Sequence, residues 1–326
     1  MSEHPIVSVV IPLYNKEREV ERAIRSVVAQ TVQDFEIVVV NDGSTDRGPE
    51  IVAGIADPRI RLLQQGNQGV SAARNRGIAE ARSHLIAFLD ADDEWKPCFL
   101  QEIMRLRAKY PGASVFATSY LFCDGEGRYS APGINGIPPH PWDGTLEDYF
   151  AIASRSDPPL WTSAVAVTKA AITSVGGFPV GVKSGEDLLT WARLAVRFHI
   201  AYSTAPCAVF LTHEEFADRA ERHDRAPDTV GKQLRQLYAQ FGSEQRHLRC
   251  YTGLWHRMRA KTFLNLGKRG AALSEIWHAL VLGGVSLRLW VYLACALAPL
   301  SLSPYLARIM HRFALRRRAC AGTERR

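Results

Sequence analysis

The first ninety residues alternate between short apolar runs rich in β-branched residues and segments with apolar positions at helical spacing. The apolar runs predict four strands, over residues 6–11, 35–40, 61–63 and 84–89. Helical spacing predicts helices over 17–30 and 69–82. β–α units that lead into a fourth strand predict a parallel sheet, and ligands of such sheets bind beyond the carboxyl ends of the strands.

Three carboxylates, Asp90, Asp92 and Asp93, stand directly after the fourth predicted strand. Without compensation they would repel one another at the edge of the sheet, and a divalent cation would relieve that repulsion. Hard oxygen ligands suit magnesium or manganese. The alternative is a solvated acidic turn. Tyr14 and Asp42 follow two other predicted strands, so both are expected to converge with Asp90 on one cleft.

Four motifs between residues 7 and 93 resemble a known protein family. They are VSVVIPLYN (7–15), VNDGSTD (40–46), NQGVSAARN (67–75) and FLDADD (88–93). In this order and spacing they resemble glycosyltransferase family 2, and the resemblance continues more weakly to about residue 215. It implies an α/β chain with the GT-A fold, a Rossmann-like mixed sheet flanked by helices. It also implies inverting transfer of a sugar from a nucleoside diphosphate donor to a hydroxyl acceptor.

The resemblance assigns donor contacts to four residues. Pro12 and Tyr14 match positions that pack on the nucleotide base, where a Tyr ring supplies apolar area and stacking. Asp42 matches a carboxylate that accepts a hydrogen bond from the base, which suits a uracil or thymine N3–H. Arg74 is expected to help neutralise the diphosphate, with a surface salt bridge as the alternative. Asn75 is expected to serve the helix rather than the donor.

The resemblance also assigns the divalent cation, Mn²⁺ or Mg²⁺. Asp90 and Asp92 match the Asp-x-Asp motif, with Asp92 as the direct ligand, and Asp93 is expected to hydrogen-bond the loop. His213 follows a strand predicted over 201–211 and stands where many relatives carry a His near the diphosphate. Its surroundings depart from the family pattern, which leaves an ordinary surface histidine as the alternative.

The second half of the chain is expected to supply the general base and the acceptor site. A strand is predicted over 161–168 and a short helix over 169–175, followed by a Gly-Gly-Phe loop at 176–178. Glu186 and Asp187 then open a further helix, as in the family. We expect Asp187 to take the proton of the acceptor hydroxyl, with Glu186 as the alternative base. In the simpler interpretation, the two are capping charges favoured by the helix dipole.

Composition sets the domain plan. With 326 residues and 47% hydrophobic content, the chain can bury one large core with an appendage. We expect a GT-A domain over 1–215, with a nucleotide-sugar-binding half (1–120) and an acceptor-binding half (121–215), and a basic helical region over 216–326. The longest irregular segment is predicted over 124–142, either a loop over the acceptor or an idle surface loop.

Cysteine usage and the start of the chain favour a cytosolic setting. The six cysteines include no Cys-x-x-Cys pair, which is typical of a reducing compartment. The first strand begins almost at once, so no cleavable signal peptide is expected.

Positive charge gathers in the C-terminal part of the chain. Residues 246–326 hold 15 Lys and Arg against 2 acidic residues, a balance of +13, which leaves −6 for the preceding 245 residues of a chain with net charge +7. Within this part, 289–307 is uncharged and just long enough for a membrane span, but Pro299 and Pro304 interrupt it. We favour helices that lie on an anionic membrane, with a span and a soluble, homo-oligomer-forming tail as alternatives. No nucleic-acid-binding motif accompanies the charge.

These features together predict a metal-dependent glycosyltransferase of the hexosyltransferase type, peripheral on the inner face of the cell membrane. Its donor would be a nucleoside-diphosphate sugar, UDP-linked, and its acceptor a glycan or lipid-linked glycan in cell-surface polysaccharide or lipopolysaccharide synthesis. The alternative is a non-catalytic nucleotide-sugar-binding or scaffold protein that retains the GT-A fold.

Overall fold

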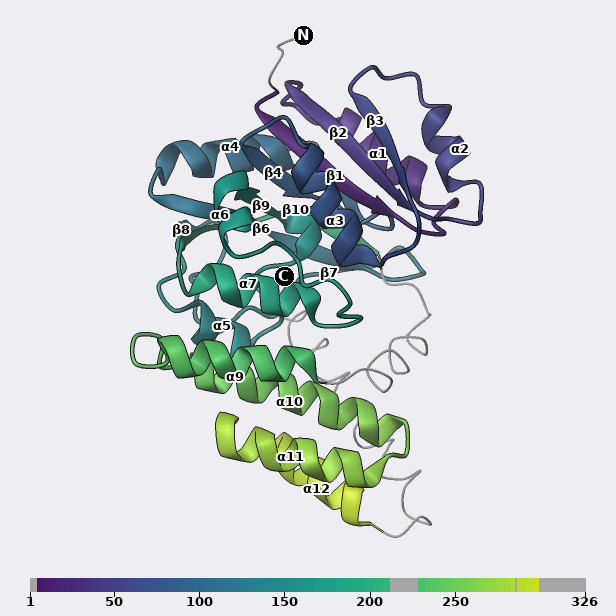
Figure 1. Ribbon diagram of the computed structural model, residues 1–326. Helices are drawn as coiled ribbons and strands as arrows, with labels where there is room; N and C mark the ends of the chain where they lie inside the picture. Colours follow the sequence, from purple (N-terminus) through teal and green to yellow (C-terminus); the bar gives the residue numbers. More distant parts are fainter. Residues whose placement is uncertain (1–4, 212–227, 285, 299–326) are drawn as a thin grey trace.

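The computed structural model describes residues 5–211, 228–284 and 286–298, and a single ten-stranded sheet forms its centre (Figure 1). The strands are β1 (Val7–Leu13), β2 (Phe35–Asp42), β3 (Ile60–Gln65), β4 (Leu85–Phe88), β5 (Glu94–Trp95), β6 (Ala113–Cys123), β7 (Tyr129–Ser130), β8 (Asp143–Thr145), β9 (Val165–Thr168) and β10 (His199–Leu211). Their order is β3-β2-β1-β4-β9-β6-β10-β5, with β7 paired to β6 and β8 paired to β10.

The N-terminal half of the sheet is parallel, as the sequence predicts. β1 pairs in parallel with β2 and with β4, and β2 pairs in parallel with β3. β9 then runs antiparallel to both β4 and β6, and β6 runs parallel to β10. The mixed α/β sheet expected from the resemblance is therefore confirmed.

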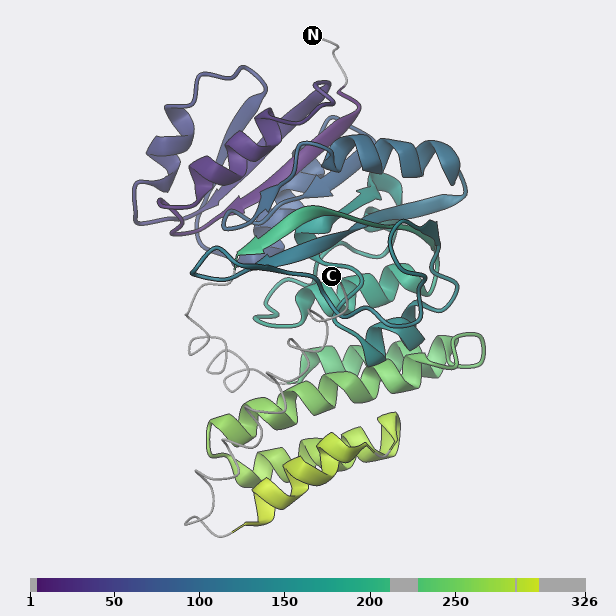
Figure 2. The same ribbon diagram turned by 180° about the vertical axis from the view of Figure 1, so that it is seen from behind.

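Helices cover both faces of this sheet (Figures 1 and 2). They are α1 (Val20–Val28), α2 (Gly48–Ala53), α3 (Val70–Glu80), α4 (Phe99–Lys109), α5 (Tyr149–Arg155), α6 (Lys169–Ser174), α7 (Glu186–Ala195), α9 (Thr229–Phe241), α10 (Leu248–Asn265), α11 (Arg269–Gly283) and α12 (Leu287–Leu297). Side chains alternate across a strand, so Val9 packs in one core with Ile24 of α1, whereas Val10 packs in a second core with Ile78 of α3. Two apolar cores thus sandwich the sheet.

The C-terminal helices extend away from the sheet in two steps. α9 and α10 belong to the core of the body, where Leu234 and Trp255 pack with Leu189 of α7. α11 and α12 form a smaller core against α10, built on Ala260, Ile276 and Leu289. The expected boundary near 215 lies outside the described residues and stays a prediction, but α9 and α10 are structurally part of the body. Among the described helices, none combines the length and apolar character needed to cross a membrane.

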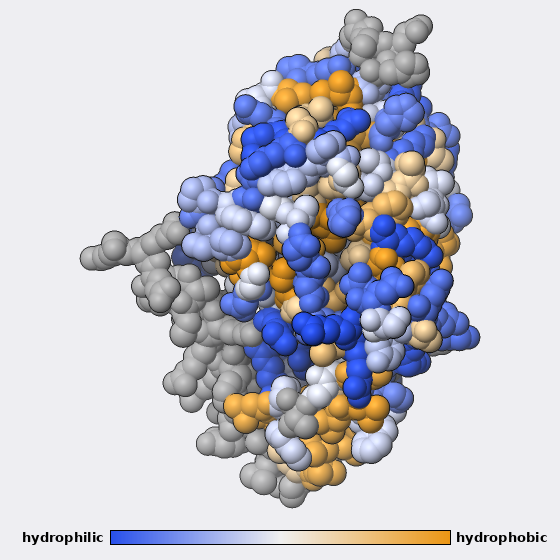
Figure 3. All heavy atoms as spheres, turned by 90° about the vertical axis from the view of Figure 1, so that its left-hand side faces the viewer, coloured by the Kyte–Doolittle hydropathy of each residue, from blue (hydrophilic) through white to orange (hydrophobic). Residues whose placement is uncertain are grey.

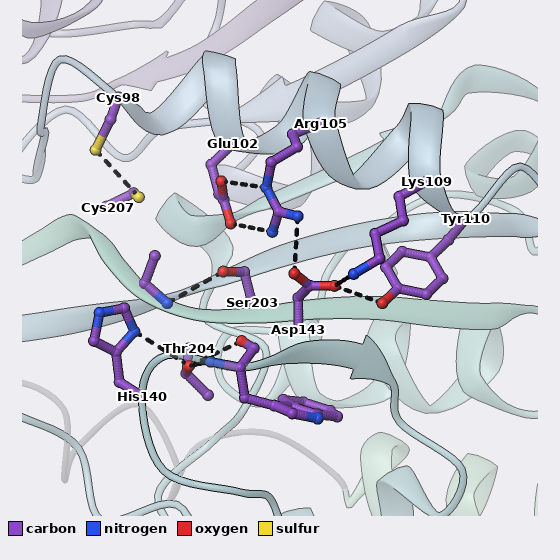
Figure 4. A network of polar contacts seen from close by, with 12 residues as sticks. Cys98, Glu102, Arg105, Lys109, Tyr110, His140, Asp143, Ser203, Thr204 and Cys207 are labelled. Atoms are coloured by element: carbon purple, nitrogen blue, oxygen red, sulfur yellow. Dashed lines mark hydrogen bonds and ion pairs between the residues drawn. The ribbon is translucent and has the colours of Figure 1, made fainter.

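An ionic network ties α4 to the edge strand β8 (Figure 4). Asp143 accepts hydrogen bonds from Lys109 Nζ at 2.6 Å and Tyr110 Oη at 2.5 Å, and it pairs with Arg105 at 2.8 Å. Burial acts to raise the pKa of Asp143, but these partners lower it to about 2. This network fixes the end of the segment 124–142, which holds only the two-residue strand β7, as the irregular composition predicts.

Candidate active site

The carboxyl ends of three adjacent parallel strands form the edge on which the predicted donor residues lie. The strand order is β2-β1-β4, and Leu13 of β1 is in register with Asn41 of β2. Tyr14, Asp42 and Asp90 therefore follow neighbouring strand ends along one edge of the sheet. That arrangement is expected for a ligand site in a parallel sheet.

Asp42 is buried and shapes the loop before α3. Its Oδ1 accepts from Gln65 Nε2 at 2.7 Å and from the Gln68 amide at 2.9 Å, and its Oδ2 accepts from the Gly69 amide at 2.8 Å. A carboxylate offers about four lone-pair positions, so one more donor can be accommodated. Tyr14 is 46% exposed and its ring is open to a stacking partner, whereas Pro12 is half-buried in β1. Their contacts with a nucleotide base stay predictions.

Arg74 of α3 joins the sheet edge to α7. Its Nη2 lies 2.6 Å from Asp90 Oδ1, its Nη1 lies 3.4 Å from Glu186 Oε1, and its guanidinium lies 5.0 Å from the centre of the Phe178 ring. Burial alone would lower its pKa, but Asp90 and Glu186 raise it. The alternative of a surface salt bridge is therefore wrong, because the guanidinium is enclosed between two carboxylates and an aromatic ring and is only 3% exposed.

The Gly-Gly-Phe loop holds that ring in place. Asn75 Nδ2 donates to the Phe178 carbonyl at 2.7 Å, and the Phe178 amide donates to Asn75 Oδ1 at 2.8 Å. A Cβ at Gly177 would lie 2.4 Å from Asn75 Oδ1, and its φ of +66° favours glycine. Asn75 thus fastens α3 to the loop that carries Phe178, which agrees with its expected structural part.

Glu186 and Asp187 open α7 beside Arg74. The turn before them is formed by Gly185, which has a φ of +77° and whose Cβ would lie 2.4 Å from the Trp255 ring of α10. Burial, and then the neighbouring charge of Asp187, raise the pKa of Glu186 to about 7. Burial also raises the pKa of Asp187, against a hydrogen bond from the Leu188 amide at 2.7 Å and the charge of Arg74. Capping charges exposed to water would not have pKa values raised by burial in this way.

The acidic turn after β4 provides two carboxylates that fit a cation and one that does not. Asp93 is buried and accepts from Ser163 Oγ at 2.5 Å and Trp161 Nε1 at 3.3 Å. Burial, with the nearby charges of Asp92 and Asp90, raises its pKa well above the usual range, and its oxygens are already engaged by the neighbouring loop. Hydrogen bonding by Asp93 to a neighbouring loop was expected.

Asp90 and Asp92 each face a cationic partner. Asp90 pairs with Arg74, and Asp92 Oδ2 lies 3.1 Å from Lys16 Nζ. One or two carboxylates completed by substrate phosphates are a usual donor set for Mg²⁺, so these residues fit the predicted ion. His213 lies outside the described residues, and its part as a ligand stays a prediction.

Lys16 and Trp255 are site residues that the sequence did not single out. Lys16 directly follows the motif at 7–15 on the same sheet edge, so its position could have identified it as a partner of the acidic turn. Trp255 is distant in sequence from α7, and no local pattern connects it with Gly185.

A second group of potential ligand atoms lies in the C-terminal helices. Atoms of Asp228, His256 and Glu275 come within 4.8 Å of one another. Arg259 Nε is 2.7 Å from Glu275 Oε1, and Arg235 Nη1 is 2.9 Å from His256 Nε2. Because arginines already engage these atoms, the group is an ion network that joins α9, α10 and α11.

Part of this chain matches a known protein family. Residues 8–158 match the sequence model of Glycosyl transferase family 2. An uncharacterized glycosyltransferase of Nostoc sp. is 47% identical over 103 residues, which are 31% of this chain and 32% of the relative. Bacillus subtilis EpsJ, also described as an uncharacterized glycosyltransferase, is 45% identical over 101 residues, 30% of this chain and 29% of the relative. The match thus spans about a third of the length of these curated relatives.

Solved structures extend the likeness to nearly the whole chain. S. aureus TarS 1-349 in complex with UDP-GlcNAc superposes with a TM-score of 0.62 at 19% identity, covering 92% of this chain and 86% of that one. The same fragment in complex with UDP gives a TM-score of 0.60 at the same identity and coverage. At this identity the likeness concerns the fold alone. With the matching motifs on the sheet edge, it shows that this chain has the GT-A fold, and residues 8–158 are a domain similar to glycosyltransferase family 2.

Proposed function

We propose that this protein is an inverting glycosyltransferase that moves a sugar from a nucleoside-diphosphate sugar to a hydroxyl group. The observation that carries the proposal is the buried junction in which Arg74 joins Asp90, at the nucleotide edge of the sheet, to the carboxylates that open α7. This junction brings a leaving-group site and a base into one place. The match of residues 8–158 to the family model and the names of the curated relatives support it.

The proposed donor is UDP-linked. Asp42 at the end of β2 has room for one more hydrogen bond, which suits uracil N3–H, and Tyr14 offers an exposed ring. Binding of UDP-GlcNAc and UDP by TarS, which shares the fold, supports a donor of this class. On α3, Ser71 Oγ and Arg74 Nε are buried without a hydrogen-bond partner among the described residues, and a diphosphate would satisfy such donors.

Asp187 is the proposed general base, with Glu186 as the alternative. As the acceptor oxygen forms a bond to the anomeric carbon, Asp187 takes the hydroxyl proton. The bond from the anomeric carbon to the diphosphate breaks on the opposite side, so the configuration inverts. The raised pKa of the pair suits this part, because a base that titrates near the working pH transfers protons most effectively.

Asp90 and Asp92 are the proposed ligands of a divalent cation. When bound, such an ion would supply Lewis-acid charge to the departing diphosphate. Lys16 now neutralises Asp92, and Arg74 neutralises Asp90. Both side chains could turn to the phosphate oxygens once the carboxylates bind the ion, so the cationic charge of the site would serve the leaving group.

The proposed acceptor is a glycan or a lipid-linked glycan precursor at the inner face of the cell membrane. The balance of +13 over residues 246–326 supports attraction to anionic lipid. Synthesis of cell-surface polysaccharide or lipopolysaccharide is the corresponding process.

A thermal-shift screen of nucleotide sugars with the purified full chain, with and without Mn²⁺, tests the donor. We expect UDP-sugars to raise the unfolding temperature more than other nucleotide sugars. Slow hydrolysis of the bound donor, measured as UDP release, then tests for catalysis without knowledge of the acceptor. Binding with no turnover in any condition would identify a non-catalytic nucleotide-sugar-binding protein, and absence of binding would contradict the proposal.

A further inference from the structure

Two tryptophans are exposed on the C-terminal helices. Trp277 of α11 is 66% exposed and Trp290 of α12 is 55% exposed. The other five tryptophans of the chain are buried or half-buried in the body. Large aromatic rings seldom face water without a partner, so this placement needs an explanation.

The tryptophans lie on the exposed sides of the paired helices α11 and α12. Leu287, Trp290 and Leu297 are exposed along one side of α12 at helical spacing, and Val281 lies one turn from Trp277 on α11. We call these five residues the tryptophan face. The opposite sides of the two helices already fill the small core around Ile276 and Leu289. Figure 3 shows apolar residues gathered at the lower end of the molecule, where α11 and α12 lie.

The part of the sequence that contains the tryptophan face is basic. Residues 246–298 contain eight Lys and Arg and one acidic residue, Glu275, which is buried in the ion network with His256 and Arg259. The following residues, 299–326, add seven Arg and one Glu. Exposed apolar side chains with tryptophans, in a part of the chain with excess positive charge, are complementary to an anionic lipid bilayer. Indole rings favour the lipid–water interface because they join apolar area to one polar N–H.

We propose that the tryptophan face is the membrane-docking surface, with Trp277 and Trp290 inserted at the headgroup level of an anionic bilayer. The inference rests on the membrane location proposed above and is independent of the sugar chemistry. α11 and α12 lie at the end of the molecule remote from β2 and β3 (Figures 1 and 2). Docking through this face therefore leaves the nucleotide edge of the sheet open to a donor from solution.

Tryptophan fluorescence of the full chain tests the proposal directly. Vesicles of phosphatidylglycerol and phosphatidylcholine should shift the emission to shorter wavelength, and brominated acyl chains should quench it, because both exposed indoles lie on the proposed face. Pure phosphatidylcholine vesicles should bind much less protein. Unchanged emission with either vesicle, or equal binding to both, would overturn an anionic-lipid face.

A paired variant identifies the surface. Trp277→Ser with Trp290→Ser should lower partition to anionic vesicles by about tenfold or more, because apolar insertion is lost. Exposed substitutions of this kind cost little stability. The matched control, Tyr129→Ser with Val180→Ser, removes two side chains of similar exposure on the body and should leave partition unchanged. UDP-sugar binding should persist in both, which separates this test from that of the donor.

Sedimentation velocity distinguishes the other occupants. A full chain that self-associates without lipid and becomes monomeric with the two Trp substitutions would assign the face to a second copy of the chain. If the variant and the wild type bind vesicles equally, membrane binding depends on charge and not on the two tryptophans. Either result would overturn the proposal.

Discussion

Around Arg74, one cation faces three carboxylates. Asp90 and Glu186 both pair with the guanidinium, and Asp187 stands beside it in the first turn of α7. If all three were ionised, the buried group would carry an excess of two negative charges. Burial is the main cause of the raised pKa values of Glu186 and Asp187, and the excess of negative charge adds to it.

Loss of the base should separate chemistry from binding. We expect Asp187→Asn to retain UDP-sugar binding, measured by calorimetry, while UDP release falls by about 10²-fold, the scale of a lost general base. Glu186→Gln is the matched control, since it removes one charge from the same turn. An inactive Glu186→Gln protein beside an active Asp187→Asn protein would exchange the two assignments.

The pH dependence follows from the same pair. A base acts only when deprotonated, and burial raises the pKa of Asp187, so kcat/KM should rise with pH and level off above an apparent pKa higher than that of an ordinary aspartate. In Glu186→Gln the neighbouring negative charge is absent, and the rising limb should move to lower pH. A limb that stays at its wild-type position in this variant would mean that another group titrates.

The acidic turn gives a matched test of the metal. Asp92→Asn should lose Mn²⁺-dependent donor binding, because a neutral amide is a poorer ligand for a hard cation. Asp93→Asn, one position along, should keep that dependence, because Asp93 is buried and its oxygens already accept from Ser163 and Trp161. Thermal shift with and without Mn²⁺ measures both. Equal loss in the two variants would indicate a damaged loop, and an unaffected Asp92→Asn protein would exclude Asp92 as a ligand.

At the scale of elements, helix α10 contributes side chains to two apolar cores. Trp255 packs in the body, whereas Ala260 packs with α11 and α12. The ion network connects α10 with α11, since Glu275 of α11 accepts from Arg259 at 2.7 Å and pairs with His256 Nδ1 at 2.6 Å. Shortening the chain before α11 would therefore leave buried charge on α10.

Glu275→Ala isolates that effect. It should lower the free energy of unfolding by about 3 kcal/mol, because it leaves the Arg259 guanidinium buried without its carboxylate. Urea denaturation measures the loss, and Glu244→Ala, an exposed position before α10, is the control and should change little. Equal stability of the two variants would mean that the network contributes nothing measurable.

The elements that the sequence predicts best are those with the most uniform burial. All eight residues of β2 are buried, and their β-branched run reveals the strand without further context. The eleven-residue strand β6 is central but interrupts its apolar residues with Thr118, Ser119 and partly buried positions, so local pattern does not reveal it. The motifs likewise predict Arg74 and Asp90, because both adjoin predicted elements. The contact of Lys16 with Asp92 depends on how segments distant in the sequence pack together, so a local sequence pattern does not predict it.

At the scale of the whole molecule, the charge division gives the chain two ends with different partners. Residues 1–245 have a net charge of −6 and contain the nucleotide edge of the sheet, whereas residues 246–326 have a net charge of +13 and contain the tryptophan face. Attraction by an anionic surface should therefore orient the molecule with its basic end toward that surface.

Truncation after residue 298 tests the basic part of this contact. It removes seven of the fifteen basic residues of 246–326 and leaves every described helix in place. Because each Lys or Arg near an anionic bilayer contributes about 1 kcal/mol, sedimentation with anionic vesicles should weaken strongly and become less sensitive to salt. Emission of the two exposed tryptophans should still respond to lipid. Identical salt dependence of the full and shortened chains would exclude the tail from the contact.

The contact between Gly185 and Trp255 should couple the evolution of two positions that are far apart in the sequence. A side chain at 185 meets the indole of α10 at 2.4 Å, and the backbone there is left-handed. Asn and Asp tolerate such a backbone, so they could replace the glycine only where the ring at 255 has become smaller. Among descendants of this sequence, we expect residues 185 and 255 to change together, and the turn that presents the base to evolve in step with a helix encoded seventy codons later.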